Sequence, residues 1–184
     1  MEAALFDYFQ RAIDLKRQLA EKYTSSMVSA SQMMTGALVA DGKIAVCGDP
    51  DTDFIAEALR RQLIYRYEIE RPGLPCIRLD PEDQSAHQSS QMRALTAPGD
   101  VLVIFATEQS STSTMQLLEL ATEKGLGIIL ACQESQEDLR QQIGPDNIEL
   151  VFGDMSKAHL LENYLSISLT LAALIDHQLF GSEI

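Results

Sequence analysis

The chain has 184 residues, and its 27 acidic residues against 14 basic ones give a formal net charge of −13. This length suits one domain, and we expect a single domain over residues 1–184. An acidic chain repels nucleic-acid backbones, and the longest basic run here is Arg60-Arg61. We therefore do not expect it to bind DNA or RNA directly.

The sequence also bears on the cell compartment. No basic and apolar leader follows Met1, and no apolar stretch approaches the roughly 18 residues of a membrane span, so we expect a cytoplasmic protein. Cys47, Cys76 and Cys132 each lie in or beside an apolar run, without Cys-x-x-Cys spacing. This pattern favours reduced, buried thiols over a disulfide or a zinc site.

Two helices are predicted at the N-terminus. Apolar residues recur at three- and four-residue spacing over 2–22, and the pattern restarts at Ser25 and Ser26 and runs to residue 40. We therefore expect a helical hairpin over 1–40. The second helix is apolar around most of its circumference, so it needs neighbours on more than one side.

An α/β core is predicted over 43–152, where apolar runs bounded by turn residues alternate with helical patterns. The expected strands are 43–47, 74–79, 101–105, 126–131 and 148–152, and the expected helices are 52–69, 115–124 and 134–142. Continuous apolar runs are typical of parallel strands buried on both faces. The predicted fold class is α/β, a three-layer α/β/α sandwich around a five-stranded parallel sheet.

The remaining segments differ in character. The stretch 80–98 is polar and weakly patterned, and no element is predicted there. A C-terminal helix is predicted over 156–180, and it too is apolar around most of its turn. Apolar helices at both ends of the chain indicate an oligomer that buries them between subunits.

The turn after the first strand is the expected place for a ligand. In parallel α/β sheets, small molecules bind outside the carboxyl ends of the strands, often at a helix N-terminus. Here Asp49, Asp51 and Asp53 occupy alternate positions of that turn, and Pro50 lacks an N–H. Three carboxylates make this a poor cradle for an anion such as phosphate.

Several short motifs, in order and spacing, carry a family resemblance. They are Ile44–Gly48, Tyr65-Arg66-Tyr67, Glu70-Arg71-Pro72, Gly99-Asp100-Val101-Leu102, Gly144-Pro145 and Leu174-Ile175-Asp176. With these motifs the chain resembles the sugar isomerase (SIS) family, in the branch that holds phosphoheptose isomerase and the DnaA initiator-associating protein. The resemblance covers nearly the whole chain and implies a flavodoxin-like five-stranded sheet and a homotetramer. The final motif looks more like the initiator-associating protein.

The ligand motifs depart from the family's pattern. The family's Gly-Asn-Gly-Gly/Thr-Ser turn is Gly48-Asp49-Pro50-Asp51-Thr52 here, and its Ser-Thr-Ser-Gly-Asn-Ser loop is Ala106-Thr107-Glu108-Gln109-Ser110-Ser111. The resemblance implies these equivalents of the ligand pocket: Gly48, Asp49, Thr52, Thr107, Glu108 and Ser111. The added carboxylates weigh against phosphosugar binding.

The catalytic positions depart as well. By resemblance, the Glu and His of the isomerases fall at Gln62 and Tyr164, and neither replacement titrates near neutral pH. We therefore expect a non-catalytic, tetrameric adaptor that binds the replication initiator DnaA. The alternatives are a phosphosugar isomerase or phosphosugar-binding protein with an altered pocket, and a scaffold for another basic partner.

Leu179 and Phe180 are the candidate partner-binding residues. They follow the last helical turn, where two large apolar side chains near Asp176 and Glu183 would suit a basic partner. Packing on the core or at a subunit interface is an equally good interpretation, because terminal helices often dock this way.

No metal or cofactor is expected. Asp49-x-Asp51-x-Asp53 begins like a calcium loop, but Phe54 and Arg60 stand where such a loop needs Gly and Glu. The three histidines, His87, His159 and His177, are too scattered to predict a metal site, and we expect His159 on the solvated side of its helix.

Overall fold

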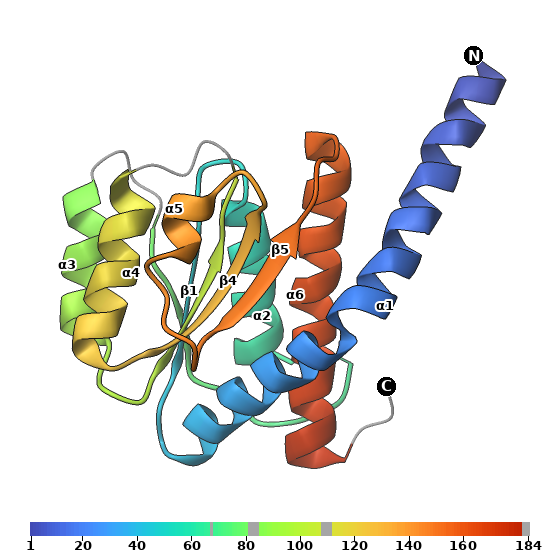
Figure 1. Cartoon of the computed structure of the whole chain (residues 1–184). Helices are drawn as coiled ribbons and strands as arrows, with labels where there is room; N and C mark the ends of the chain where they lie inside the picture. The colour runs from blue at the N-terminus through green and yellow to red at the C-terminus, as the bar shows by residue number, and fades with distance from the viewer. Residues whose placement is uncertain (67, 81–84, 108–111, 182–184) are drawn as a thin grey trace.

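The computed structural model describes residues 1–66, 68–80, 85–107 and 112–181 of the chain (Figure 1). Its centre is a sheet of five parallel strands in the order β2-β1-β3-β4-β5. The strands are β1 (Ile44–Gly48), β2 (Cys76–Arg78), β3 (Val101–Phe105), β4 (Gly127–Gln133) and β5 (Ile148–Phe152). Every residue of β1 and β3 is buried, as continuous apolar runs predict.

Helices cover both faces of the sheet, so the predicted three-layer sandwich is confirmed (Figure 1). The helices are α1 (Glu2–Val39), α2 (Asp53–Ile64), α3 (Ser85–Leu95), α4 (Thr112–Lys124), α5 (Glu137–Arg140) and α6 (Lys157–Phe180). Successive strand residues point to opposite faces and therefore feed two cores. Ile44 and Val46 join the core under α1, α2 and α6, whereas Ala45 and Cys47 join the core under α3 and α4.

The prediction of an N-terminal helical hairpin is wrong, because α1 is one continuous helix of 38 residues. The buried stripe runs through the expected break: Leu19, Tyr23, Met27, Ala30, Met34 and Ala37 are all buried at three- or four-residue spacing. Serine tolerates a helix interior at small cost, so Ser25 and Ser26 do not end the helix. The C-terminal half of α1 lies under the sheet, whereas its N-terminal end extends beyond the body of the molecule (Figure 1).

Other elements also differ from the sequence prediction. The helix expected at 52–69 ends at Ile64, where Arg71 donates to the carbonyl oxygens of Gln62 at 2.7 Å and Leu63 at 2.8 Å. An arginine that caps the last carbonyls takes the place of a further helical turn. Strand β2 has only three residues, and α3 forms in the stretch where no element was predicted. Met92 is fully buried from α3, and one anchor of this kind leaves little periodic signal in a sequence.

Helix α6 is apolar because it is a central helix of the fold. Among the described helices, α6 alone is long and apolar enough to cross a membrane, judged by length and composition. Half of its apolar 18-residue segment is buried inside the protein. It packs against both α1 and α2. The buried ion pair between Arg71 Nε and Asp176 Oδ1, at 2.6 Å, ties it to the end of α2.

The cysteines behave as predicted, since Cys47, Cys76 and Cys132 are buried and free. Burial raises the pKa of each thiol to about 12. These side chains therefore remain protonated and serve as small apolar groups of the core.

Candidate functional site

The crevice at the centre of the sheet lies between the carboxyl ends of β1 and β3. The chain leaves β1 toward β2 on one side and returns to β3 on the other, which makes this the topological switch point. Gly48 and Phe105 lie opposite each other at the two strand ends. A Cβ at Gly48 would lie 2.6 Å from the Thr52 hydroxyl, so only glycine fits beneath the turn.

Asp49 fills this crevice with its own carboxylate. One oxygen accepts the backbone N–H groups of Asp51, at 2.9 Å, and Thr52, at 3.1 Å. The other accepts the backbone N–H of Thr107, at 2.7 Å, and its hydroxyl, at 2.5 Å. The N–H groups of the turn before α2 and of Thr107, which could bind an external anion, therefore already hold an internal one.

Thr52 completes the link between the two strands. Its fully buried hydroxyl donates to the Phe105 carbonyl at 2.6 Å and accepts the Asp49 N–H at 2.9 Å. On the far side of Thr107, Gln136 Nε2 donates to the Thr107 carbonyl at 2.7 Å. The β1 turn, the end of β3 and the loop after β4 are thus held as one hydrogen-bonded unit.

The three aspartates of the turn point in different directions, so the expected convergence of their charges is not observed. Asp49 points into the crevice, whereas Asp51 pairs with Lys157 at 2.5 Å. Asp53 pairs with Arg78 of β2, also at 2.5 Å. The other predicted pocket residues, Glu108 and Ser111, lie outside the described residues.

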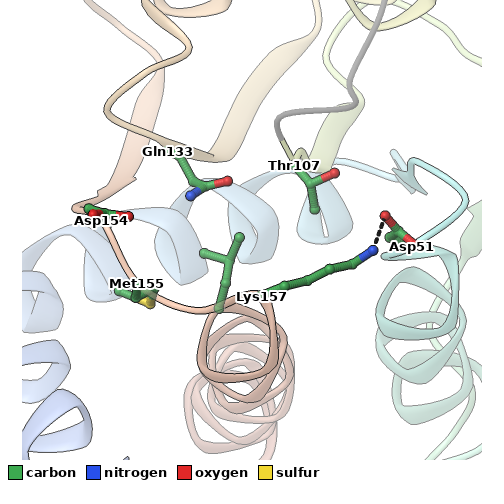
Figure 2. A pocket seen from close by; sticks show the side chains of 7 residues that line it. Asp51, Thr107, Gln133, Asp154, Met155 and Lys157 are labelled. Atoms are coloured by element: carbon green, nitrogen blue, oxygen red, sulfur yellow. Dashed lines mark hydrogen bonds and ion pairs between the residues drawn. The ribbon is translucent and has the colours of Figure 1, made fainter. Parts of the chain in front are cut away.

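A pocket of about 180 Å³ opens beside this crevice, at the carboxyl ends of β3 and β4 (Figure 2). Its lining consists of Asp51, Thr107, Gln133, Asp154, Met155, Lys157 and Leu160. Lys157 is the first residue of α6, and its side chain extends across the pocket toward Asp51 (Figure 2). Of the lining residues, sequence reasoning had named Thr107 as a pocket equivalent and Asp51 as part of the turn. It had missed Gln133 at the end of β4, Asp154 in the connection after β5 and Lys157 at the start of α6.

The two degenerate catalytic positions do not line this pocket. Tyr164 is fully buried, packs against Phe105 and Phe152, and donates its hydroxyl to the Ala106 carbonyl at 2.7 Å. Burial raises the pKa of Tyr164 well above its ordinary value, so its role is structural. Gln62 is half-buried on α2, where its backbone carbonyl accepts from Arg71.

Of the C-terminal pair, Leu179 is half-buried and Phe180 is exposed. Leu179 packs against the core, and Phe180, 42% exposed, lies over the Arg71 guanidinium at 5.8 Å. Asp176 does not ring an exposed anchor, because it is buried in its ion pair with Arg71. Glu183 lies outside the described residues.

His159 is buried, not solvated as expected. Its ring stacks on Tyr8 of α1 at 4.5 Å, and its Nδ1 lies 3.3 Å from a carboxylate oxygen of Glu162. Tyr8 of α1 therefore covers the part of α6 that was expected to be solvated. Within the described part of the chain, no three His, Cys, Asp or Glu side chains gather closely enough to bind a metal ion.

Comparison with known proteins places this arrangement in a family. The family model that describes the SIS domain matches residues 7–131. The chain belongs to the SIS domain family. A phosphoheptose isomerase of Chromohalobacter salexigens is 31% identical over 98% of this chain and 98% of its own length. A second, from Halorhodospira halophila, is 28% identical over 94% of this chain and 93% of its own length.

Solved structures agree with the SIS assignment. A phosphoheptose isomerase from Francisella tularensis superposes with a TM-score of 0.86 at 26% identity, over 95% of this chain and 97% of the other. The corresponding enzyme from Neisseria gonorrhoeae, at 22% identity, has a TM-score of 0.83 over 95% and 98% and shows the same fold.

These relatives overturn the expectation of a non-catalytic DnaA adaptor. The relatives that align over nearly the full chain are named phosphoheptose isomerase, an enzyme. The adaptor hypothesis rested on the Gln62 and Tyr164 replacements and on the closing motif, and the phosphosugar alternative agrees better with the relatives.

Proposed function

We propose that this protein is a phosphosugar isomerase of the SIS family, with a pocket rebuilt around Asp51, Asp154 and Lys157. One observation carries the proposal: an open polar pocket at the carboxyl ends of the strands brings an ammonium group together with two carboxylates. The phosphoheptose isomerase relatives support the substrate class, a phosphorylated sugar of about seven carbons.

The lining supplies the groups that such a reaction needs. Aldose–ketose isomerisation moves a hydrogen between neighbouring carbons, so it requires a base at carbon and a proton donor at oxygen. Asp154 is the proposed base, because the other carboxylate, Asp51, is paired with Lys157 at 2.5 Å. The Lys157 ammonium polarises the carbonyl oxygen or meets the phosphate, and Gln133 and Thr107 offer hydrogen bonds to sugar hydroxyls.

Charge sets the expected affinity. Lys157 is the cation among the described lining residues, and it must share its charge between Asp51 and any bound phosphate. Asp49 already uses the N–H groups of the crevice, so we propose that the phosphate lies on the Lys157 side. Binding is therefore expected in the millimolar range, on the order of 4 kcal/mol.

We also propose that the protein works in the cytoplasm, where thiols such as these stay reduced. The homotetramer expected from the sequence stays a prediction, and size-exclusion chromatography with light scattering measures it.

The test uses sedoheptulose 7-phosphate as the probe. Calorimetric titration and NMR of the sugar after incubation measure binding and conversion separately. We expect a saturable signal and a slow appearance of the isomeric aldose phosphate.

Two variants of the pocket test the role of its charges. Lys157→Met should weaken binding at least about tenfold, because it removes the cation, and Asp51→Asn should strengthen binding about fivefold, because it removes a competing carboxylate. Lys124→Met is the matched control: Lys124 lies on α4, where it donates to the Arg93 carbonyl, and its loss should change nothing. No binding and no conversion at about 10 mM sugar would refute the proposal.

A further inference from the structure

Gln136 lies behind the candidate pocket and joins two of the residues that line it. It directly precedes α5 and is only 9% exposed. Its side-chain Nε2 donates to the Thr107 carbonyl at 2.7 Å, and its Oε1 accepts the backbone N–H of Gln133 at 2.9 Å. Thr107 and Gln133 lie on the same side of the pocket, across from Lys157 (Figure 2). One buried amide therefore spans the ends of two neighbouring strands, β3 and β4.

This amide stands where the next hydrogen bond between β3 and β4 would form. The register of the two strands ends at Ala131 of β4. In a continued parallel ladder, the next bond would run from the Gln133 N–H to the Ala106 carbonyl. That N–H donates instead to Gln136, and the Ala106 carbonyl accepts the Tyr164 hydroxyl at 2.7 Å. The two strands therefore separate at the level where the pocket opens, and the amide bridges the opening.

The chemistry of a glutamine side chain suits this bridge. Its partners are a backbone carbonyl, which only accepts, and a backbone N–H, which only donates. These partners fix which end of the amide faces which strand. An ionised carboxylate has no donor for the carbonyl, and an aliphatic side chain satisfies neither partner. At neutral pH, glutamine is the side chain of this length that meets both requirements.

We propose that Gln136 is a positioning residue for sugar binding, which holds Thr107 and Gln133 at the spacing that neighbouring hydroxyls of a sugar require. The inference rests on the proposed function, in which these two side chains contact the sugar. The Thr107 hydroxyl donates to Asp49 and keeps lone pairs for a sugar hydroxyl, while the Gln133 amide can both donate and accept. Partners that are already in place lose less conformational entropy when the ligand binds. Gln136 does not line the pocket, so it acts through these two residues.

Two substitutions separate the parts of the bridge. Gln136→Met keeps the length of the side chain and removes both hydrogen bonds. Gln136→Glu keeps an acceptor for the Gln133 N–H but places a negative oxygen against the Thr107 carbonyl at neutral pH. Gln141→Met is the matched control, because Gln141 is an exposed glutamine at the other end of α5.

NMR titration of the isotope-labelled protein measures binding of two probes, sedoheptulose 7-phosphate and inorganic phosphate. Gln136→Met should raise the dissociation constant of the sugar phosphate about fivefold or more, because the hydrogen bonds to its hydroxyls lose their alignment. The dissociation constant of inorganic phosphate should stay within about twofold of the wild type, because Lys157 on α6 binds it. Lys157→Met should weaken binding of both probes, and Gln141→Met should weaken neither.

A pH series tests the bridge itself. The carboxyl group that Gln136→Glu introduces is buried beside a carbonyl oxygen, and both conditions raise its pKa. Once protonated, this group again offers one donor and one acceptor. The ratio of its sugar dissociation constant to that of the wild type should therefore fall from about fivefold at about pH 8 toward unity at about pH 5. The ratio for Gln136→Met should stay constant. Measuring the wild type at each pH cancels the titration of the sugar phosphate and of the other pocket groups.

The outcomes separate this role from the proposed function. Sugar binding by Gln136→Met equal to that of the wild type overturns the positioning role, and so does a Gln136→Glu variant that stays weak at about pH 5. Loss of inorganic phosphate together with the sugar in Gln136→Met would show that the residue only maintains the fold, which also overturns the role. These results leave the proposed function standing. A wild type that binds no sugar phosphate at about 10 mM overturns the proposed function and this role together.

Discussion

Asp49 is the side chain whose removal should reveal most about this site. Its carboxylate accepts the N–H groups of Asp51, Thr52 and Thr107 and the Thr107 hydroxyl. Asp49→Ala removes this acceptor from all of these donors, although the Thr52 N–H keeps its second acceptor, the Asp49 backbone carbonyl, at 2.9 Å. Those at Asp51 and Thr52 lie in the turn that leads into α2, where losing one such hydrogen bond costs about 1 kcal/mol. Those at Thr107 are buried, and an unsatisfied buried donor costs about 1–3 kcal/mol.

Together these losses predict that Asp49→Ala lowers the free energy of unfolding by about 3 kcal/mol. For a chain of this size the melting temperature should fall by about 10 °C. Asp49→Asn should cost about 1–2 kcal/mol, because its amide oxygen can serve only one side of the crevice and its NH₂ group then faces donors on the other. The exposed Asp146→Ala is the control and should stay within about 0.5 kcal/mol of the wild type.

Urea denaturation followed by circular dichroism measures these differences at one fixed protomer concentration, because self-association adds to apparent stability. If Asp49→Ala unfolds at the wild-type urea midpoint, the N–H and hydroxyl donors of the crevice bind water as favourably as they bind the carboxylate. The internal-anion account of the site would then be wrong. If Asp49→Asn equals the wild type while Asp49→Ala does not, shape and not charge is what the crevice requires.

Two further predictions concern buried carboxylates elsewhere in the fold. Asp100 is buried, and although desolvation raises its pKa, hydrogen bonds from Ala97 and Lys43 outweigh that effect and leave the pKa below its ordinary value. The stabilising effect of ionised Asp100 should be complete above about pH 4 and lost as the pH falls through the lowered pKa. Asp100→Asn should therefore lower the free energy of unfolding near pH 7 and progressively less in acid. Urea titrations at several pH values measure this difference. Arg71→Met should cost about 3–5 kcal/mol by leaving Asp176 buried without its partner, whereas Arg71→Met/Asp176→Leu should recover much of that loss; additive losses in a double-mutant cycle would contradict a coupled pair.

The site differs from a simple phosphate cradle in where its negative charge sits. An aspartate in the turn after β1 would be expected to repel a phosphate, yet Asp49 is bound by the donors around it and closes the crevice. The space for a ligand opens instead toward Gln133, Asp154 and Lys157. Pocket chemistry in this chain therefore depends on the start of α6 and the connection after β5 as much as on the turn after β1.

The sequence alone determined the sheet and the family. The runs 101–105 and 148–152 match β3 and β5 residue for residue. Strand β3 is buried throughout and continuously apolar, whereas β5 is apolar except for Glu149 and only partly buried. The order of short motifs identified the SIS family, which the family model confirms over residues 7–131. Local pattern was less reliable at Ser25, where it predicted a break that the buried stripe of α1 overrides.

Only the tertiary structure decided what the polar residues do. The donors that occupy Asp49 come partly from Thr107, 58 positions away, and Lys157 reaches Asp51 across 106 positions. Likewise, Tyr8 of α1 covers the His159 ring. Hydrophobic periodicity is a local property that a sequence displays directly. A carboxylate, in contrast, acts either as a repulsive charge or as an internal hydrogen-bond acceptor, and the donors that the fold brings within about 3 Å of it decide which.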